Sequence, residues 1–199
     1  MELPDFTVEH LKKLPLRAIV AFAARCARRV EPLAQLPEGD PQRESRREAI
    51  EAALRLADSF ARGTAEPPDE SVVAAIDASR DAGAEPAAAA ASAIAQAARA
   101  AASAWRAGSR VAREGGAPGK RATEAERALG TVTRITADLA AVNAFAAVGE
   151  AFVSAGYRDE DFVDAALSDY DKLVRLRLGR YPELGNPVDP SAVGPLGPL

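Results

Sequence analysis

The sequence predicts an all-α fold: a bundle of six or seven helices followed by an extended C-terminal tail. Hydrophobic residues make up 48% of the 199 residues but aromatic residues only 5%, so alanine, leucine and valine must build the core. Alanine has the highest helix propensity and is depleted in strands. Apolar residues recur at helical spacing along the chain, and no convincing strand-like alternation is found. We therefore expect one alanine-rich helical domain over residues 1–179 and a tail over residues 180–199.

The first half of the chain contains four predicted helices. A short one starts near Phe6 and ends at Pro15. The second covers "LPLRAIVAFAARCARRVEPL", which Pro32 should end or kink. Its apolar face is predicted to contain Ile19, Phe22, Ala23, Cys26, Val30 and Leu33, with Arg17, Arg25, Arg28 and Arg29 mostly off it. The third has Asp40 as N-cap and Gly63 as its C-terminal stop. A shorter helix is expected over residues 70–82.

Three further segments follow. The alanine tract from Glu85 to Glu114 is predicted to be helical because of its propensity, although it looks like low complexity. The next helix has apolar residues at alternating spacings of four and three, which predicts the packed seam of the bundle's central helix. That seam contains Ala128, Val132, Ile135, Leu139, Val142, Ala146, Gly149 and Val153. The last helix should run from Asp159 to Leu178, with acids near its start and basic residues near its end.

The tail has too many prolines and glycines to continue the helix. It is expected to pack back onto the bundle, and a linker or a peptide docked on a neighbour are the alternatives. Its candidate apolar anchors are Tyr181, Leu184, Val188, Val193 and Leu196.

The glycine-rich stretch "REGGAPGKRAT", Arg113 to Thr123, is the segment that most resembles a phosphate-binding loop. Such a loop needs glycine, four residues, then glycine–lysine and a hydroxyl residue, between a strand and a helix. Glu114 occupies the first glycine position and Arg121 the hydroxyl position, and a predicted helix precedes the stretch. We therefore interpret it as a helix–helix connection and expect no nucleotide cofactor.

No strong catalytic pattern is found. His10 is the single histidine, which excludes histidine-based triads and multi-histidine metal sites within one chain. Cys26 lies on an apolar helix face, where a buried structural thiol is favoured over a nucleophile. Asp161, Asp164 and Asp171 are the best clustered acids, and their positions favour capping and solvation over acid–base catalysis. We expect a protein that is not an enzyme and that holds no metal or cofactor.

Charge is distributed unevenly. Residues 99–134 hold eight basic and three acidic residues, whereas residues 158–171 hold six acidic and one basic. Four arginines spaced seven, four and three apart should line one face of the alanine-rich helix and form a possible partner-binding row: Arg99, Arg106, Arg110 and Arg113. A solvated face is the alternative. Trp105 is the one aromatic residue in that helix, so the aromatic interleaving used by single-strand nucleic-acid binders is absent.

Composition suggests the compartment and the class of partner. The net charge of −4 argues against a dedicated nucleic-acid binder. A single cysteine fits a reducing compartment, and the start "MELPDFTVEH" does not resemble a signal peptide. The uncharged run Leu139 to Gly149 is shorter than a bilayer requires. We expect a cytoplasmic protein that binds another protein, with oligomerisation open.

Two segments resemble a known bacterial family. "AARCARRVEPL" (Ala23 to Leu33) and "RREAIEAALRLADSFARG" (Arg46 to Gly63) are similar to the N-terminal helices of alanine-rich immunity proteins of toxin–immunity gene clusters. The alanine-rich middle is similar in style, so the resemblance covers about half of the chain. This chain lacks the histidines that the family places in its alanine-rich helices. The resemblance implies a non-enzymatic protein that binds a cognate partner, and it supplies no catalytic residues.

The leading hypothesis is thus a helical protein–protein interaction module, such as an immunity or conflict-system protein, that uses the arginine row or the tail. The alternatives are a structural or oligomerisation domain, and a ligand-binding helical domain whose site is assembled from distant residues. An oligomerisation domain should show a large apolar surface on the helix with the heptad seam. A ligand-binding domain should show a pocket with converging polar groups.

Overall fold

The structure, a computed structural model, describes residues 5–34, 38–64, 87–114, 124–156 and 159–199; side chains are not described for 110–114 and 124–129. These ranges contain six α-helices and no strand, which confirms the all-α prediction. The α-helices are α1 (Val8–Leu11), α2 (Leu16–Val30), α3 (Arg43–Arg62), α5 (Ala87–Glu114), α6 (Glu124–Ala155) and α7 (Glu160–Arg175), and the 3₁₀ helix η2 is Glu31–Ala34. The helix predicted over residues 70–82 lies outside the described residues.

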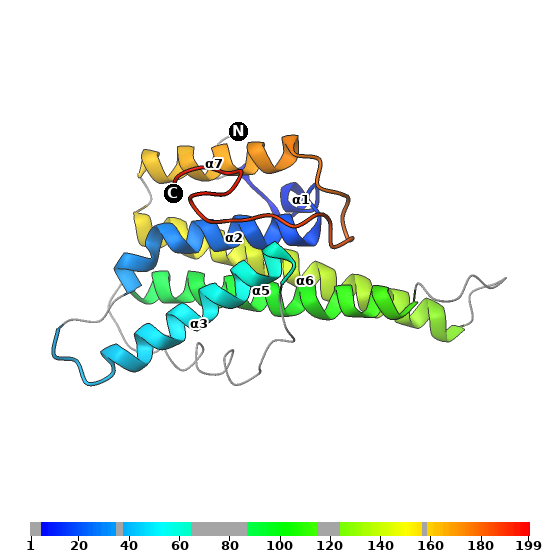
Figure 1. Cartoon of the computed structure of the whole chain (residues 1–199), viewed down its shortest axis with the longest axis horizontal. Coiled ribbons are helices and arrows are strands. Elements are labelled where there is room, and N and C mark those ends of the chain that lie inside the picture. The colour runs from blue at the N-terminus through cyan, green and yellow to red at the C-terminus, as the bar shows by residue number, and fades with distance from the viewer. Residues whose placement is uncertain (1–4, 35–37, 65–86, 115–123, 157–158) are drawn as a thin grey trace.

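Helix α2 is the central element of the bundle. It packs against α3, α5, α6 and α7, and twelve of its fifteen residues are buried. Figure 1 shows α5 and α6 side by side beneath α2, with α7 on the opposite side of α2. The prediction that the helix containing residues 128–153 is central was therefore wrong, because α2 takes that place.

Small side chains allow α5 and α6 to pack closely along much of their length. The buried side of α5 consists mostly of alanines between Ala89 and Ala107. The buried side of α6 is similar and contains Ala137, Ala140, Ala141, Ala144, Ala147 and Ala151. Because alanine has no atoms beyond Cβ, the two helix axes can approach closely without leaving voids. The predicted helix in the alanine tract is thus confirmed, and its composition explains the tight α5–α6 pairing.

Local signals account for several helix boundaries. Pro15 precedes the first residue of α2, and the chain changes at Glu31 to the 3₁₀ helix η2, which contains Pro32. Gly63 ends α3 with a left-handed φ of 75°, as its sequence position predicts. Asp40 was wrongly predicted as the N-cap of α3: the N-cap is Gln42, and the Asp40 carboxylate accepts the Gln42 backbone N–H at 2.8 Å.

The tail lies against the bundle between α2 and α7, as Figure 1 shows in orange and red. Its backbone completes the start of α2: the N–H groups of Leu16 and Arg17 donate to the carbonyl oxygens of Glu183 (2.9 Å) and Leu184 (3.0 Å). These N–H groups have no partner within their own helix, so the tail caps α2. Of the predicted anchors, Val188 and Leu196 are buried and Tyr181 and Leu184 pack against the core, whereas Val193 is 92% exposed.

Candidate functional site

The outward side of α6 carries large apolar side chains that nothing described covers. Val132, Ile135, Leu139 and Val142 are 42–61% exposed, and the same line continues through Ala146, Gly149 and Val153. We call these seven residues the outer row. The residues spaced three and four apart do lie on one side of α6, as predicted. The prediction that this side packs into the bundle was wrong, because it faces outward. The alanines of α6 face the bundle, and the larger side chains face outward.

Neighbouring elements border the outer row on both flanks. On one side the Asn143 amide lies 3.5 Å from the Ser103 hydroxyl of α5. On the other side Asp138 accepts a hydrogen bond from the Tyr181 hydroxyl at 2.6 Å and pairs with Lys12 at 3.1 Å. Burial works against ionisation of Asp138, but these two donors outweigh it, and the pKa of Asp138 is lowered. Both flanks of the row thus contact neighbouring elements through polar groups.

By length and composition alone, the part of α6 from Gly130 to Ala155 could cross a membrane, and 39% of its most apolar stretch is buried. This apolar stretch is longer than the uncharged run Leu139 to Gly149 considered in the sequence. It combines two different surfaces, the alanine side in the core and the outer row. Among the described residues, the outer row is the apolar surface of α6 that is exposed.

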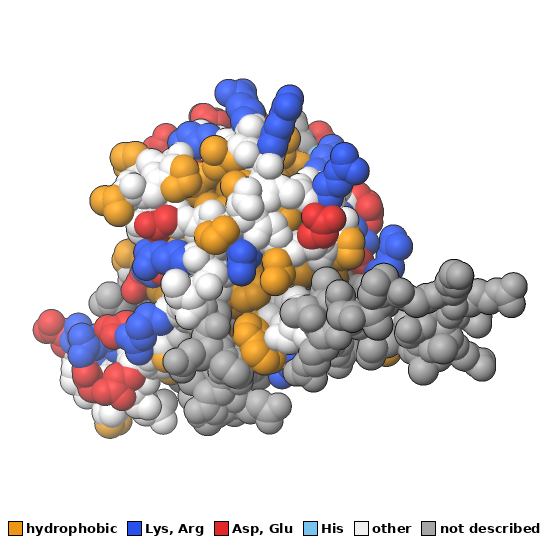
Figure 2. Space-filling model, turned by 45° about the vertical axis from the view of Figure 1, so that its right-hand side comes forward, with side chains coloured by type: hydrophobic (Ala, Val, Ile, Leu, Met, Phe, Trp, Pro, Cys, Tyr) orange, Lys and Arg blue, Asp and Glu red, His pale blue; other side chains and the backbone are white. Residues whose placement is uncertain are grey.

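The predicted arginine row is described only in part. Arg99 is half-buried and Arg106 is exposed on α5, and both take part in polar interactions. The side chains of Arg110 and Arg113 lie outside the described residues. Figure 2 shows positive, negative and hydrophobic side chains intermixed on one face of the molecule, so neither charge occupies that face alone. The partner-binding role of this row stays a prediction.

A charge cluster lies in the core between α2, α7 and the tail. The Arg25 side chain is fully buried, and its Nε donates to Asp169 Oδ2 at 2.6 Å. Its other nitrogens donate to tail carbonyl oxygens, among them those of Gly197 (2.9 Å) and Pro198 (2.6 Å). Arg29 donates to the same Asp169 oxygen at 2.6 Å. The prediction that Arg25 lies off the buried face was therefore wrong, and Asp169 was not singled out in the sequence.

This cluster has a structural role in the described structure. Arg25 is fully buried and each of its three guanidinium nitrogens donates to an acceptor within the chain, so the side chain is not exposed to a ligand. The buried charge is compensated by one carboxylate and by several backbone carbonyl dipoles. A tail rich in proline suits this arrangement, because proline disfavours helices and strands, so the tail carbonyl groups are not used in a regular hydrogen-bonding pattern. The cluster anchors the tail.

Cys26 and His10 are located where structural roles were expected. Cys26 is buried, and burial raises the pKa of its thiol to about 12. A protonated thiol is a poor nucleophile. The His10 Nδ1 atom lies 3.2 Å from the Thr7 backbone nitrogen at the start of α1, and its ring stacks on Phe6 with centroids 5.5 Å apart. His10 thus caps a short helix.

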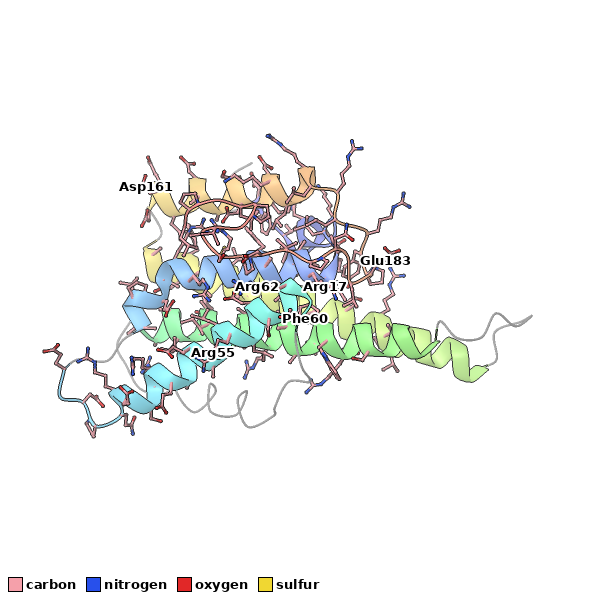
Figure 3. The ribbon with its side chains drawn as sticks, viewed as in Figure 1. Arg17, Arg55, Phe60, Arg62, Asp161 and Glu183 are labelled. Atoms are coloured by element: carbon pink, nitrogen blue, oxygen red, sulfur yellow. The ribbon has the colours of Figure 1, made fainter. Side chains whose placement is uncertain are left out.

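The predicted acids Asp161, Asp164 and Asp171 are exposed along α7, and Figure 3 shows Asp161 at the start of that helix, pointing away from the bundle. Asp159, the N-cap of α7, accepts the Phe162 backbone N–H at 3.0 Å. Within the described part of the chain, no group of three or more histidine, cysteine or acidic residues could hold a metal ion.

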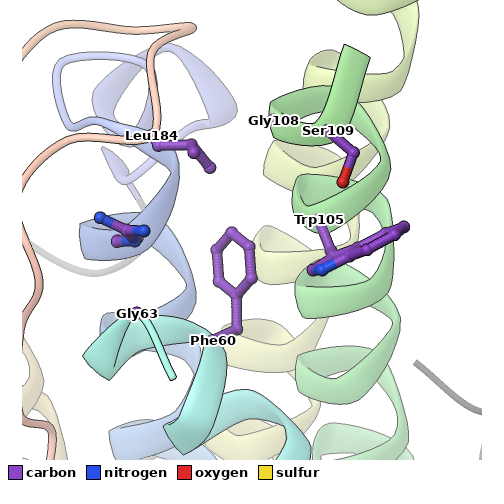
Figure 4. Close-up of a pocket in the computed structure, with 7 residues that line it drawn as sticks. Phe60, Gly63, Trp105, Gly108, Ser109 and Leu184 are labelled. Atoms are coloured by element: carbon purple, nitrogen blue, oxygen red, sulfur yellow. The ribbon is translucent and has the colours of Figure 1, made fainter. Parts of the chain in front are cut away.

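A pocket of about 200 Å³ lies between α2, α3, α5 and the tail (Figure 4). Its lining is Arg17, Phe60, Gly63, Trp105, Gly108, Ser109 and Leu184. One Arg17 nitrogen donates to the Gly185 carbonyl oxygen at 2.8 Å. The lining provides one cation, one indole and one hydroxyl but no carboxylate, imidazole or thiol, so this pocket can hold an apolar group and lacks an acid–base pair.

No protein-family model, curated protein or solved structure matches the chain.

Proposed function

We propose that this chain is a non-enzymatic helical protein–protein interaction module whose principal contact surface is the outer row of α6. The observation that carries the proposal is the reversal of α6: its alanines are buried while Val132, Ile135, Leu139 and Val142 are exposed. Scattered exposed hydrophobic residues are normal in proteins, but a contiguous apolar patch marks an interaction surface.

The form of this surface fits recognition of another helix. Its residues alternate spacings of three and four, which is the pattern through which helices pack into one another's grooves. The row runs over 22 residues, about three heptads, with a length of about 30 Å. A partner helix laid along it would remove large apolar side chains from water, at about 25 cal/mol for each Å² buried.

The resemblance to alanine-rich immunity proteins supports a specific class of partner. Under this proposal the chain is an immunity protein that binds a toxin encoded beside it, and the complex neutralises the toxin by contact. The inert environment of Cys26 and the structural roles of Arg25 and Asp169 agree with action by binding. The arginine row of α5 is the second candidate contact surface, because Arg106 is exposed.

A binding experiment with matched variants tests the proposal. The full chain is tested for binding to the products of neighbouring genes, with Leu139→Glu to disrupt the outer row and Val193→Glu as an exposed control on the tail. We expect Leu139→Glu to lose the partner and Val193→Glu to keep it. If the Arg106→Glu/Arg110→Glu variant loses partner binding and Leu139→Glu keeps it, the contact surface lies on α5. Wild-type chain that binds none of these products would contradict the immunity role.

A further inference from the structure

The two halves of the outer row differ in side-chain size. The half nearer the start of α6 has Val132, Ile135, Leu139 and Val142, which are all large and exposed. The other half has Ala146 and Gly149 before Val153. A Cβ atom added at Gly149 would meet nothing within 4 Å, so this half leaves open space beside the helix. The row therefore consists of a raised half and a hollow half of similar length.

A surface of this kind is complementary to itself when one copy is reversed. In an antiparallel pair of α6 helices centred between Ala140 and Ala141, Ile135 lies opposite Ala146 of the second copy and Leu139 opposite Val142. Val132 then lies opposite Gly149. Val132 and Ile135 thus each meet a small residue, and at the centre of the contact Leu139 meets the smaller Val142, an alternation of sizes that favours close packing. A parallel pair would place large against large and leave a gap at Gly149.

We infer that the outer row binds the outer row of a second copy of this chain, through an antiparallel α6–α6 contact with two-fold symmetry. This inference rests on the proposed function, in which the outer row is a protein contact surface, and it names the partner. The same patch serves both subunits, as in an isologous dimer. Antiparallel helices also place opposite ends of their dipoles side by side.

The charges along α6 favour this partner over a membrane or a strongly charged protein. Between Gly130 and Ala155 the charged residues are Arg134, Asp138 and Glu150, and none belongs to the outer row. Asp138 is already bound to Lys12 and Tyr181. Helices that lie on membrane surfaces carry lysine and arginine along their polar face, whereas the flank of this row contains Thr136, Asn143 and Glu150. An uncharged helical row is the better fit.

The first test is the mass of the full chain in solution, measured by size-exclusion chromatography with light scattering from about 1 to 100 µM. We expect a dimer with twice the chain mass of 20.8 kDa. Leu139→Glu should raise the dissociation constant by at least about 30-fold, as loss of a central contact does. Val193→Glu, on the tail, should leave it unchanged. Gly149→Leu should weaken the dimer by filling the hollow half without lowering the thermal stability of the monomer.

The second test is the direction of pairing. Ile135→Cys and Ala146→Cys chains are mixed and oxidised. The antiparallel arrangement predicts a cross-linked heterodimer in the mixture and little product from either variant alone, because residues 135 of the two copies would lie about 16 Å apart. Cys26 does not compete, since it is buried and its thiol keeps its proton. Cross-linking of each variant with itself would show a parallel pair and overturn the proposed geometry.

The outcomes separate this inference from the proposed function. A chain that is monomeric at 100 µM, yet binds a neighbouring gene product and loses it in Leu139→Glu, overturns self-association and keeps the interaction module. Monomeric chain that sediments with anionic phospholipid vesicles through the outer row assigns the row to a bilayer and overturns both proposals. A monomer whose Ile135→Cys thiol is protected from labelling shows that another segment of the same chain covers the row, which also overturns both.

Discussion

Arg25 and Asp169, which are 144 positions apart in the sequence, form a buried ion pair with 2.6 Å between Nε and Oδ2. The pair joins α2 to α7, and the remaining donors of Arg25 bind the tail. One side chain thus connects three parts of the chain that are distant in sequence. Its position at the centre of the fold makes it the first target for a stability test.

Arg25→Met should lower the free energy of unfolding by about 3–5 kcal/mol, because Asp169 is then left buried beside Arg29 alone and several tail carbonyls lose their donor. Urea denaturation followed by circular dichroism measures this. Arg47→Met, in the exposed pair with Glu44, is the matched control and should have no measurable effect. If the two variants unfold at the same urea concentration, Arg25 does not anchor the tail.

The Cys26 thiol should be inert in the folded protein and should contribute to loss of stability at alkaline pH. Burial raises its pKa from 9.0 to about 12, so between these values the unfolded chain loses the thiol proton and the folded chain keeps it. The contribution of the Cys26 thiol to the free energy of unfolding is therefore fully present below about pH 9 and declines as the pH rises above that value. Tyr170 and Tyr181, whose pKa values are also raised, act in the same direction.

A thiol reagent at pH 8 should thus react with Cys26 only after denaturant is added. Cys26→Ala should make the alkaline decline of the unfolding free energy shallower, which urea titrations between pH 8 and pH 11 would measure. The comparison uses the slope with pH, because removing the sulfur atom also changes packing at every pH. Rapid labelling of the native protein would show that this part of α2 opens to solvent.

Gly108 allows the tail to approach α5. A Cβ atom at this position would lie 2.5 Å from Leu184 Cδ2. Alanine in a helix is favoured over glycine by about 1 kcal/mol, so Gly108→Ala should stabilise the protein only when Leu184 no longer occupies that space. We expect little gain or a loss in the wild type, a gain of up to about 1 kcal/mol in the Leu184→Ala background, and hence a measurable coupling.

Unfolding of these variants can be followed by fluorescence, because Trp105 is the single tryptophan and lines the same pocket as Gly108 and Leu184. Gly130→Ala is the matched control, since Gly130 is also a helical glycine, has open space around it and lies outside the outer row. Additive free energies for Gly108 and Leu184 would mean that the tail does not press on α5.

The elements that the sequence predicted well depend on short-range signals. Proline lacks the N–H that a helix interior needs, and accordingly Pro15 precedes α2 and Pro32 follows its end. Gly63 adopts a left-handed conformation that other residues disfavour. The helix in the alanine tract follows from propensity alone. The error at Asp40 is local too: an aspartate can cap a turn before a helix as readily as the helix itself.

The errors that affect the candidate site depend on long-range packing. Spacings of three and four show that α6 has two different sides, but they do not show which side is buried. The side with the larger apolar side chains was predicted to face the core. In the structure the alanines of α5 and α6 are buried together, which allows a close helix–helix approach, and the larger side chains of α6 lie on the outer side. For Arg25, nothing nearby in the sequence indicates the partner, since Asp169 and the tail lie more than 140 residues away.

Two adjacent residues of α6 offer a direct test of its orientation. Ala140 is fully buried, whereas Leu139 is 49% exposed. Ala140→Leu should reduce the free energy of unfolding by about 1–3 kcal/mol, because the added atoms must push α2 or α5 away, and this cost should not depend on protein concentration. Leu139→Ala should have little effect in dilute protein and a larger one in concentrated protein, since only the associated state uses this side chain. Chemical denaturation at two protein concentrations measures both. A larger cost for Leu139→Ala than for Ala140→Leu in dilute protein would mean that the outer row faces the core.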